Sequence, residues 1–138
     1  MKSVLRLLIL FFISSVIISS GCKKGGGGGG GSEANLVVTT NPPINQTQLP
    51  SNGPFNLTIT ITSTMPPGGV KIEVNARKDD GTNPAPFFST TIASTSNATT
   101  NITITNTPAA TQCIVDIKVT SLSKSTNTWT GVYRYSRK

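Results

Sequence analysis

Side chains able to do acid–base or nucleophilic chemistry are few in this chain of 138 residues. It contains no histidine, which excludes an imidazole base and a histidine metal ligand. It has two cysteines, Cys22 and Cys113, and five acidic residues. The glycine run at 25–31 lacks the Lys-Ser/Thr ending that a phosphate-binding loop requires. This inventory argues against an enzyme and implies no cofactor.

Two of the acids are neighbours in the segment DDGTN at 79–83. Asp-Gly is a tight-turn sequence, so we interpret Asp79 and Asp80 as turn residues. The alternative is a calcium site that uses oxygens of Asp79, Asp80 and Asn83. Calcium takes six to eight oxygen ligands, usually in a recognisable loop, and this segment supplies few of them. We therefore expect no metal site.

Two further acids, Glu73 and Asp116, fall on the outward face of segments with strand-like alternation. We expect solvated cross-strand ion pairs with the neighbouring Lys71 and Lys118. Cys113 begins another alternating segment and is interpreted as a small buried hydrophobe. A reactive thiol or an intermolecular disulfide at Cys113 is the alternative.

Three aromatic residues share one parity near the end of the chain, namely Trp129, Tyr133 and Tyr135 in the segment 128–136. They are interpreted as large residues that close a core, with Gly131 able to host a β-bulge between them. Aromatic rings on an open sheet face can also stack on sugars. The three residues are therefore also candidate glycan contacts, or part of a protein-contact patch.

The N-terminus has the organisation of a secretory signal peptide over residues 1–21. Lys2 and Arg6 precede an apolar run, LLILFFISSVII at 7–18, and small residues follow this run at 19–21. The apolar run is short for a membrane span, which needs roughly 20 residues. An uncleaved membrane anchor is the alternative.

The residues around Cys22 resemble the lipobox of bacterial lipoproteins, in which small residues precede a lipidated cysteine. The resemblance covers residues 1–22, with Ser19 where the family usually has an aliphatic residue. It implies cleavage between Gly21 and Cys22, a diacylated thiol, and an amine acylated with a fatty acid such as palmitate. Lys23 is not the Asp that can retain a lipoprotein at the inner membrane, so the resemblance implies the outer membrane. The alternative is a secreted protein in which Cys22 has no such role.

The segment 22–34 is predicted to be a flexible tether. Two or more acyl chains hold a protein stably on a bilayer, and Lys23 and Lys24 are placed to meet anionic headgroups. The seven glycines at 25–31 have a large entropy cost on ordering. Residues 23–34 would reach roughly 40 Å when extended, or about 20 Å as a coil. The tether would lift a folded domain clear of the lipid.

The remaining residues, 35–138, form one predicted domain of antiparallel strands. The segment FNLTITITS alternates strictly between apolar and polar residues, and other segments repeat this pattern. All nine prolines fall between the alternating segments, and PPGG and DDGTN are turn sequences. No window has a helical apolar period. The seven predicted strands are 35–40, 55–63, 70–78, 87–94, 100–106, 113–121 and 128–136.

Seven short strands in about 100 residues favour an all-β sandwich. Their number and spacing resemble the immunoglobulin-like or fibronectin-type-III-like domains of bacterial surface proteins. The chain lacks the cysteine pair of antibody domains and the tryptophan of their third strand. The similar segments NLTITITS at 56–63 and NITITN at 101–106 are expected to pair as second and fifth strands of one sheet.

The charge of the chain says little about its partner. The whole chain has a net charge of +7, but the domain at 35–138 has eight Lys and Arg against four acids, which leaves it about +4. A mildly basic, exported domain does not indicate a nucleic-acid partner. We expect a lipid-anchored, non-catalytic protein of the bacterial envelope with a structural, adhesive or protein-binding role. The alternative is a carbohydrate-binding module.

Overall fold

The computed structural model describes residues 32–138 of the chain. The predicted signal peptide at 1–21, the cleavage point between Gly21 and Cys22, and the glycine run all lie outside the described residues. The described residues form a single compact unit with its own hydrophobic core.

All seven predicted strands are confirmed, and residues 32–138 contain no helix. The largest difference lies at the first strand, which begins at Val38 rather than at residue 35. The Leu36 N–H donates instead to the side chain of Asn127, 2.9 Å away. The strands are β1 (Val38–Asn41), β2 (Phe55–Ile61), β3 (Val70–Lys78), β4 (Phe88–Thr95), β5 (Thr99–Ile104), β6 (Thr111–Ser121) and β7 (Thr128–Arg137).

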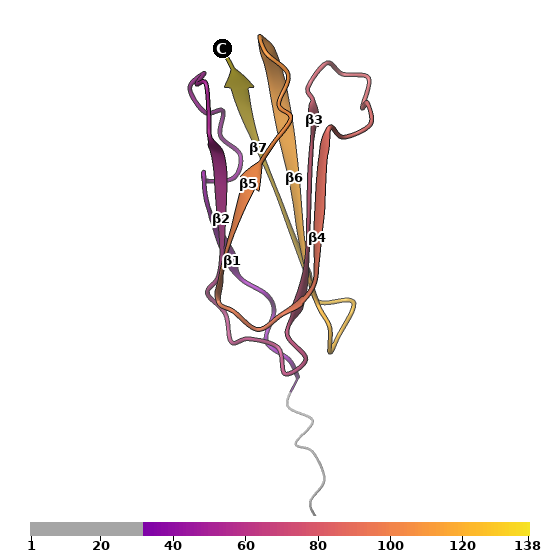
Figure 1. The fold of residues 1–138 in the computed structure, drawn as a ribbon. Coiled ribbons are helices and arrows are strands. Elements are labelled where there is room, and N and C mark those ends of the chain that lie inside the picture. Colours follow the sequence, from indigo (N-terminus) through magenta and orange to yellow (C-terminus); the bar gives the residue numbers. More distant parts are fainter. Residues whose placement is uncertain (1–31) are drawn as a thin grey trace, which may run out of the picture. The chain divides into compact units, whose positions relative to one another are not determined.

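The strands form two antiparallel sheets that face each other as a sandwich (Figure 1). One sheet has the order β1-β2-β5, and the other has the order β4-β3-β6-β7. The expected pairing of the two similar segments is confirmed, because β2 pairs with β5 from Phe55 opposite Ile104 to Thr60 opposite Thr99.

The core consists of the inward-facing residues that strict alternation predicted. Period-two side chains project to opposite faces of a sheet, so one face of each strand enters the space between the sheets. Ile102 is only partly buried, because β5 lies at the edge of its sheet. The core strand residues include Leu57, Ile59, Ile61, Val70, Ile72, Val74, Ala76, Ile104, Cys113, Val115, Ile117 and Val119.

The predicted turn at 66–69 is also confirmed. The Gly69 N–H donates to the Pro66 carbonyl at 2.8 Å, and Gly69 has a φ of +75°. A Cβ at Gly69 would lie 2.6 Å from the carbonyl oxygen of Thr95, so glycine is required there for space as well as for backbone angle.

The connection between β1 and β2 covers the outer edge of β7. Residues 45–51 run beside this strand, with parallel bridges from Thr47 to Arg134 and from Ser51 to Arg137. The Asn45 N–H donates to the Val132 carbonyl at 2.7 Å, and the Gln48 N–H donates to the Arg134 carbonyl at 2.8 Å. Covering an edge in this way removes a site for unwanted strand pairing.

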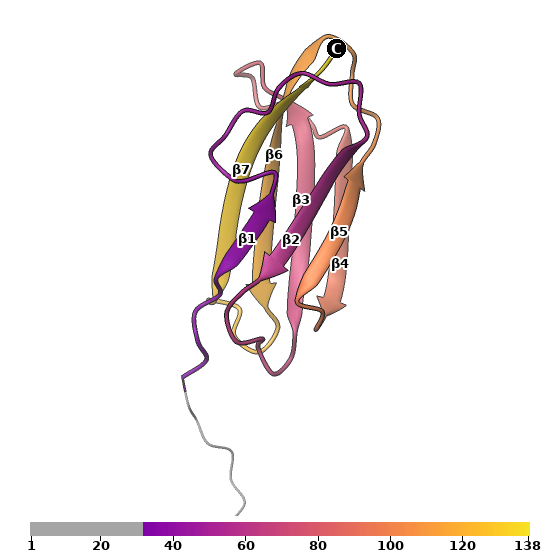
Figure 2. The same cartoon turned by 90° about the vertical axis from the view of Figure 1, so that its left-hand side faces the viewer.

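The two ends of the described chain lie at opposite ends of the sandwich (Figure 2). Residue 32 is at one end, and the C-terminus is at the other, together with the segments 42–54, 79–87 and 105–110. A tether joined to residue 32 would therefore leave these three loops facing away from its attachment.

Candidate functional site

Tyr133 and Tyr135 are core residues, each 2% exposed. Their rings lie 6.2 Å apart, and the Phe55 ring lies 4.5 Å from that of Tyr135. The interpretation of the tyrosines as core residues is right. The open platform on a sheet face that was considered for sugar stacking is not present, because both rings point between the sheets.

Trp129 does not join the two tyrosines. It is partly buried against the core, and its indole lies over Gly131. A Cβ at Gly131 would come within 2.4 Å of Cη2 of the indole and 2.7 Å of Cγ2 of Ile44. The bulge that Gly131 was considered able to host is not present, since the pairing of β7 with β6 continues through Gly131 opposite Ile117 without a shift. Gly131 instead provides room for the ring.

A cavity of about 300 Å³ opens between the β1–β2 connection and β7. The two tyrosines belong to its lining, and Leu49, 89% exposed, lies at its mouth. Its volume is at the lower end of the range of small-molecule sites. The lining residues are Pro42, Gln48, Leu49, Ser51, Pro54, Phe55, Asn56, Tyr133 and Tyr135.

The two tyrosine hydroxyls have different surroundings. The Tyr135 hydroxyl lies 2.7 Å from Oγ1 of Thr107, in a buried hydrogen bond. Nothing among residues 32–138 forms a hydrogen bond with the Tyr133 hydroxyl. Within these residues, Ser63 alone has a side-chain oxygen that is both fully enclosed and unpartnered. The Tyr133 oxygen therefore keeps contact with the cavity that it lines.

The surroundings of the tyrosines favour their neutral forms. Burial raises the pKa of Tyr133 far above its ordinary value of 10.0, and the nearby Tyr135 adds to this effect. Burial likewise raises the pKa of Tyr135 to about 12, although the hydrogen bond between Tyr135 and Thr107 opposes the change. Among residues 32–138, no charged residue lines the cavity, so this lining is electrically neutral and suits an uncharged ligand.

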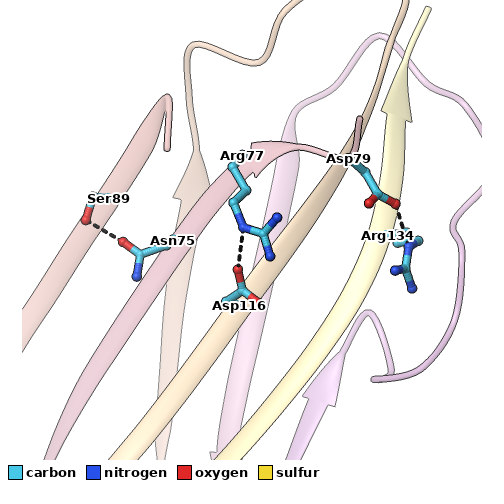
Figure 3. Close-up of polar contacts among 6 residues, drawn as sticks. All are labelled: Asn75, Arg77, Asp79, Ser89, Asp116 and Arg134. Carbon is cyan, nitrogen blue, oxygen red and sulfur yellow. Dashed lines mark hydrogen bonds and ion pairs between the residues drawn. The ribbon is translucent and has the colours of Figure 1, made fainter. Parts of the chain in front are cut away.

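The outer face of the four-stranded sheet carries a second group of polar contacts (Figure 3). Nε of Arg77 donates to Oδ2 of Asp116 at 3.1 Å, and Nε of Arg134 donates to Oδ2 of Asp79 at 2.6 Å. Both pairs are partly exposed. Surface pairs of this kind add little stability, and here they neutralise the two acids.

A shallow hollow of about 360 Å³ lies on the same face, beside the loop that follows β3. Asn75 lines it and accepts a hydrogen bond from Oγ of Ser89 at 2.6 Å (Figure 3). Both arginine–aspartate groups near it are paired, so we see no free acid or base there. The lining residues are Asn75, Arg77, Asn83, Pro84, Ala85, Pro86 and Asp116.

The acidic segment at 79–83 is a turn, as predicted. Oδ1 of Asp80 accepts hydrogen bonds from the Thr82 N–H and hydroxyl, and these bonds lower the pKa of Asp80. Asp79 points to Arg134, and Asn83 adopts a left-handed φ of 53°. In the described part of the chain, no three His, Cys, Asp or Glu side chains are grouped to hold a metal ion.

The predicted partners of the strand acids are partly wrong. Glu73 pairs with Lys71 at 2.9 Å, but along β3 and not across two strands, and this contact lowers the pKa of Glu73. Asp116 pairs with Arg77 rather than with Lys118, because the register places Lys118 directly opposite Glu73.

Cys113 is confirmed as a buried residue and is fully covered. Burial raises the pKa of its thiol, which opposes formation of a reactive thiolate.

Sequence reasoning missed the walls of the cavity. Pro42, Gln48, Leu49 and Pro54 belong to a segment that was interpreted only as a connection between strands. The one available signal was that this segment, 42–54, contains no charged residue.

Comparisons of the chain with protein-family models, with curated proteins and with solved structures find no match. Across residues 32–138, no helix has the length and apolar character to cross a membrane.

Proposed function

We propose that this chain is a lipid-anchored, non-catalytic protein of the bacterial envelope, whose sandwich binds another protein. The anchor in this proposal is Cys22, acylated after cleavage behind Gly21, and the outer membrane is the proposed location. The orientation of the sandwich supports such a role, because residue 32 and three long loops lie at opposite ends (Figure 2).

We further propose an immunoglobulin-like domain of the fibronectin type III kind. In a constant-type immunoglobulin domain, the fourth strand joins the sheet of the first, second and fifth strands. Here β4 pairs with β3 instead, so the sheets have the orders β1-β2-β5 and β4-β3-β6-β7. This strand order supports the fibronectin-like variant.

The observation that carries the proposed protein-binding role is a pair of free strand edges on one side of the sandwich. Only three residues separate β4 from β5, and within residues 32–138 each of these strands pairs on one side only. Neither contains a charge or a proline, and the whole stretch 81–115 is uncharged. Ile92 and Ile102, one on each strand, are only partly buried.

Natural proteins usually protect an edge with charges, prolines or a covering segment. The β7 edge of this sandwich has such a cover, in residues 45–51. On β4 the protection is limited to a register shift opposite Val70 and Ile72. An extended segment of a partner could therefore add to β4 or β5 through backbone hydrogen bonds.

A lysine placed on the free edge tests this role. Thr91→Lys puts a charge on exposed β4, and Thr39→Lys is the matched control on exposed β1. Residues 32–138 serve as bait for envelope proteins, and hydrogen exchange maps the amides that a captured protein protects. We expect protection in β4 or β5 and loss of capture by Thr91→Lys alone. Equal capture by both variants, with protection elsewhere, would refute the proposed edge.

Carbohydrate binding is the second function that we propose, and the cavity beside β7 is the observation that favours it. The cavity contains the two predicted contact residues Tyr133 and Tyr135, but Trp129 does not line it. Saturable binding of a saccharide by residues 32–138 would support this function.

A further inference from the structure

We propose that the cavity beside β7 binds one neutral sugar residue, whose hydroxyl groups pair with the hydroxyl that Tyr133 presents to the cavity. This inference deepens the carbohydrate-binding alternative and rests on it. It names the site, the anchoring atom and the class of sugar.

The Tyr133 hydroxyl is the first argument. The residue is 2% exposed, yet its hydroxyl has no hydrogen-bond partner among residues 32–138 and opens to the cavity. This oxygen is not fully enclosed, so it is free to form a hydrogen bond with a molecule in the cavity. The neighbouring Tyr135 shows the ordinary arrangement, in which Thr107 satisfies the hydroxyl. A ligand hydroxyl would complete the same arrangement at Tyr133.

The walls of the cavity are the second argument. Pro42, Pro54 and Phe55 present apolar surfaces, while Gln48 and Asn56 bring amide groups to the lining. Oδ1 of Asn56 already accepts a hydrogen bond from Thr103 at 2.9 Å, which leaves its NH₂ group to donate. A pyranose ring combines an apolar C–H face with a rim of hydroxyl groups. It therefore matches a cavity that is apolar with a few placed polar groups.

Size and charge restrict the ligand further. A volume of about 300 Å³ suits one ring, with the rest of an oligosaccharide extending past the exposed Leu49. Within the described part of the chain, the lining contains no arginine or lysine that could pair with a uronic acid or a sulfated sugar. The site should therefore select neutral sugars over acidic ones.

The test is a titration of isotope-labelled residues 32–138, followed through their backbone amide signals. The probes are the methyl glycosides of glucose, galactose and N-acetylglucosamine, with glucuronic acid as a charged comparison and hexaproline as a peptide comparison. We expect saturable shifts in residues 48–56 and 133–135 with at least one neutral glycoside. Glucuronic acid and hexaproline should cause none.

Substitution of the anchoring tyrosine separates binding from folding. Tyr133→Phe keeps the ring and should weaken sugar binding about fivefold or more, as loss of one hydrogen bond predicts. Its melting temperature should stay equal or rise, because the hydroxyl has no partner in the protein. Trp129→Phe, outside the cavity, should leave the affinity unchanged.

Each other outcome overturns the inference in a recognisable way. Unchanged sugar affinity in Tyr133→Phe would show that the Tyr133 hydroxyl does not bind the sugar. Shifts with hexaproline alone would show that the cavity binds peptides and not sugars. Saturable sugar shifts on another surface would keep the carbohydrate-binding function but refute this site. The absence of shifts with every glycoside would refute both, without bearing on the β4 and β5 edges.

Discussion

The side chain of Asn127 binds the backbone at Leu36, which lies 91 residues earlier in the chain, with a hydrogen bond of 2.9 Å. Its Nδ2 group also donates to the Ala34 carbonyl at 2.9 Å and to the carboxylate of Glu33. Asn127 is 7% exposed. It thus fastens the residues before β1 to the turn between β6 and β7, where a pull on the proposed tether would first act.

Asn127→Ala should lower the free energy of unfolding by about 1–3 kcal/mol, because the buried Leu36 N–H loses its acceptor. Urea unfolding of residues 32–138, followed by Trp129 fluorescence, measures the change. Asn97→Ala, at an exposed position between β4 and β5, is the matched control and should have little effect. Equal stabilities for the two variants would show that Asn127 does not fasten the N-terminal residues.

The strands could be predicted from the sequence because the signal for them is local. In β2, four apolar and three polar residues alternate without interruption, and prolines or glycines lie in four of the six connections between strands. The same alternation identified the inward faces, including that of Cys113. The start of β1 was misplaced by three residues, since the competing partner of Leu36 is a side chain far along the chain.

The candidate site could not be predicted in the same way. The cavity forms where residues 42–56 lie beside Tyr133 and Tyr135, and no local pattern links segments so far apart. The sequence did identify both tyrosines as candidate contacts. It could not show that the Tyr135 hydroxyl binds Thr107 while the Tyr133 hydroxyl lacks a partner among residues 32–138, because this depends on contacts between distant segments. The role of Gly131 could not be predicted either, because it depends on the position of the Trp129 ring.

Gly131→Ala should destabilise the sandwich by about 1–3 kcal/mol, the usual range for an added group in a filled space. The new methyl group would collide with the Trp129 indole and with Ile44. We expect a lower melting temperature and a shifted Trp129 emission. Thr130→Ala, at the exposed neighbouring position, should change neither. Normal stability and emission in Gly131→Ala would mean that the indole is not fixed over Gly131.

Alkaline pH should destabilise the domain through its two buried tyrosines. Folding raises the pKa of Tyr135 from 10.0 to about 12, and raises that of Tyr133 as well. The stabilisation is therefore complete below pH 10 and is lost as the pH rises through about 12. The free energy of unfolding should fall by about 1.4 kcal/mol per pH unit for each tyrosine in this window. Urea unfolding at stepped pH measures this slope.

The variant Tyr133→Phe/Tyr135→Phe is the control for the alkaline effect. It has no phenol to ionise, so its stability should depend less steeply on pH above 10. Part of its stability at neutral pH should be lost, because the hydrogen bond between Tyr135 and Thr107 is removed. If the free energy of unfolding of the double variant fell as steeply with pH above 10 as that of the wild type, groups other than these two tyrosines would cause the loss of stability.

The proposed anchor depends on the thiol of Cys22, and Cys22→Ser should abolish it. Several acyl chains hold a protein on a bilayer, whereas the unacylated chain has no comparable hold. We expect radiolabelled palmitate to enter the wild-type protein in bacterial cells but not Cys22→Ser, which should leave the membrane fraction. Cys113→Ser is the matched control and should still be labelled, because Cys113 is buried in the core. Label retained by Cys22→Ser, or a free Cys22 thiol in the mature wild type, would refute the anchor.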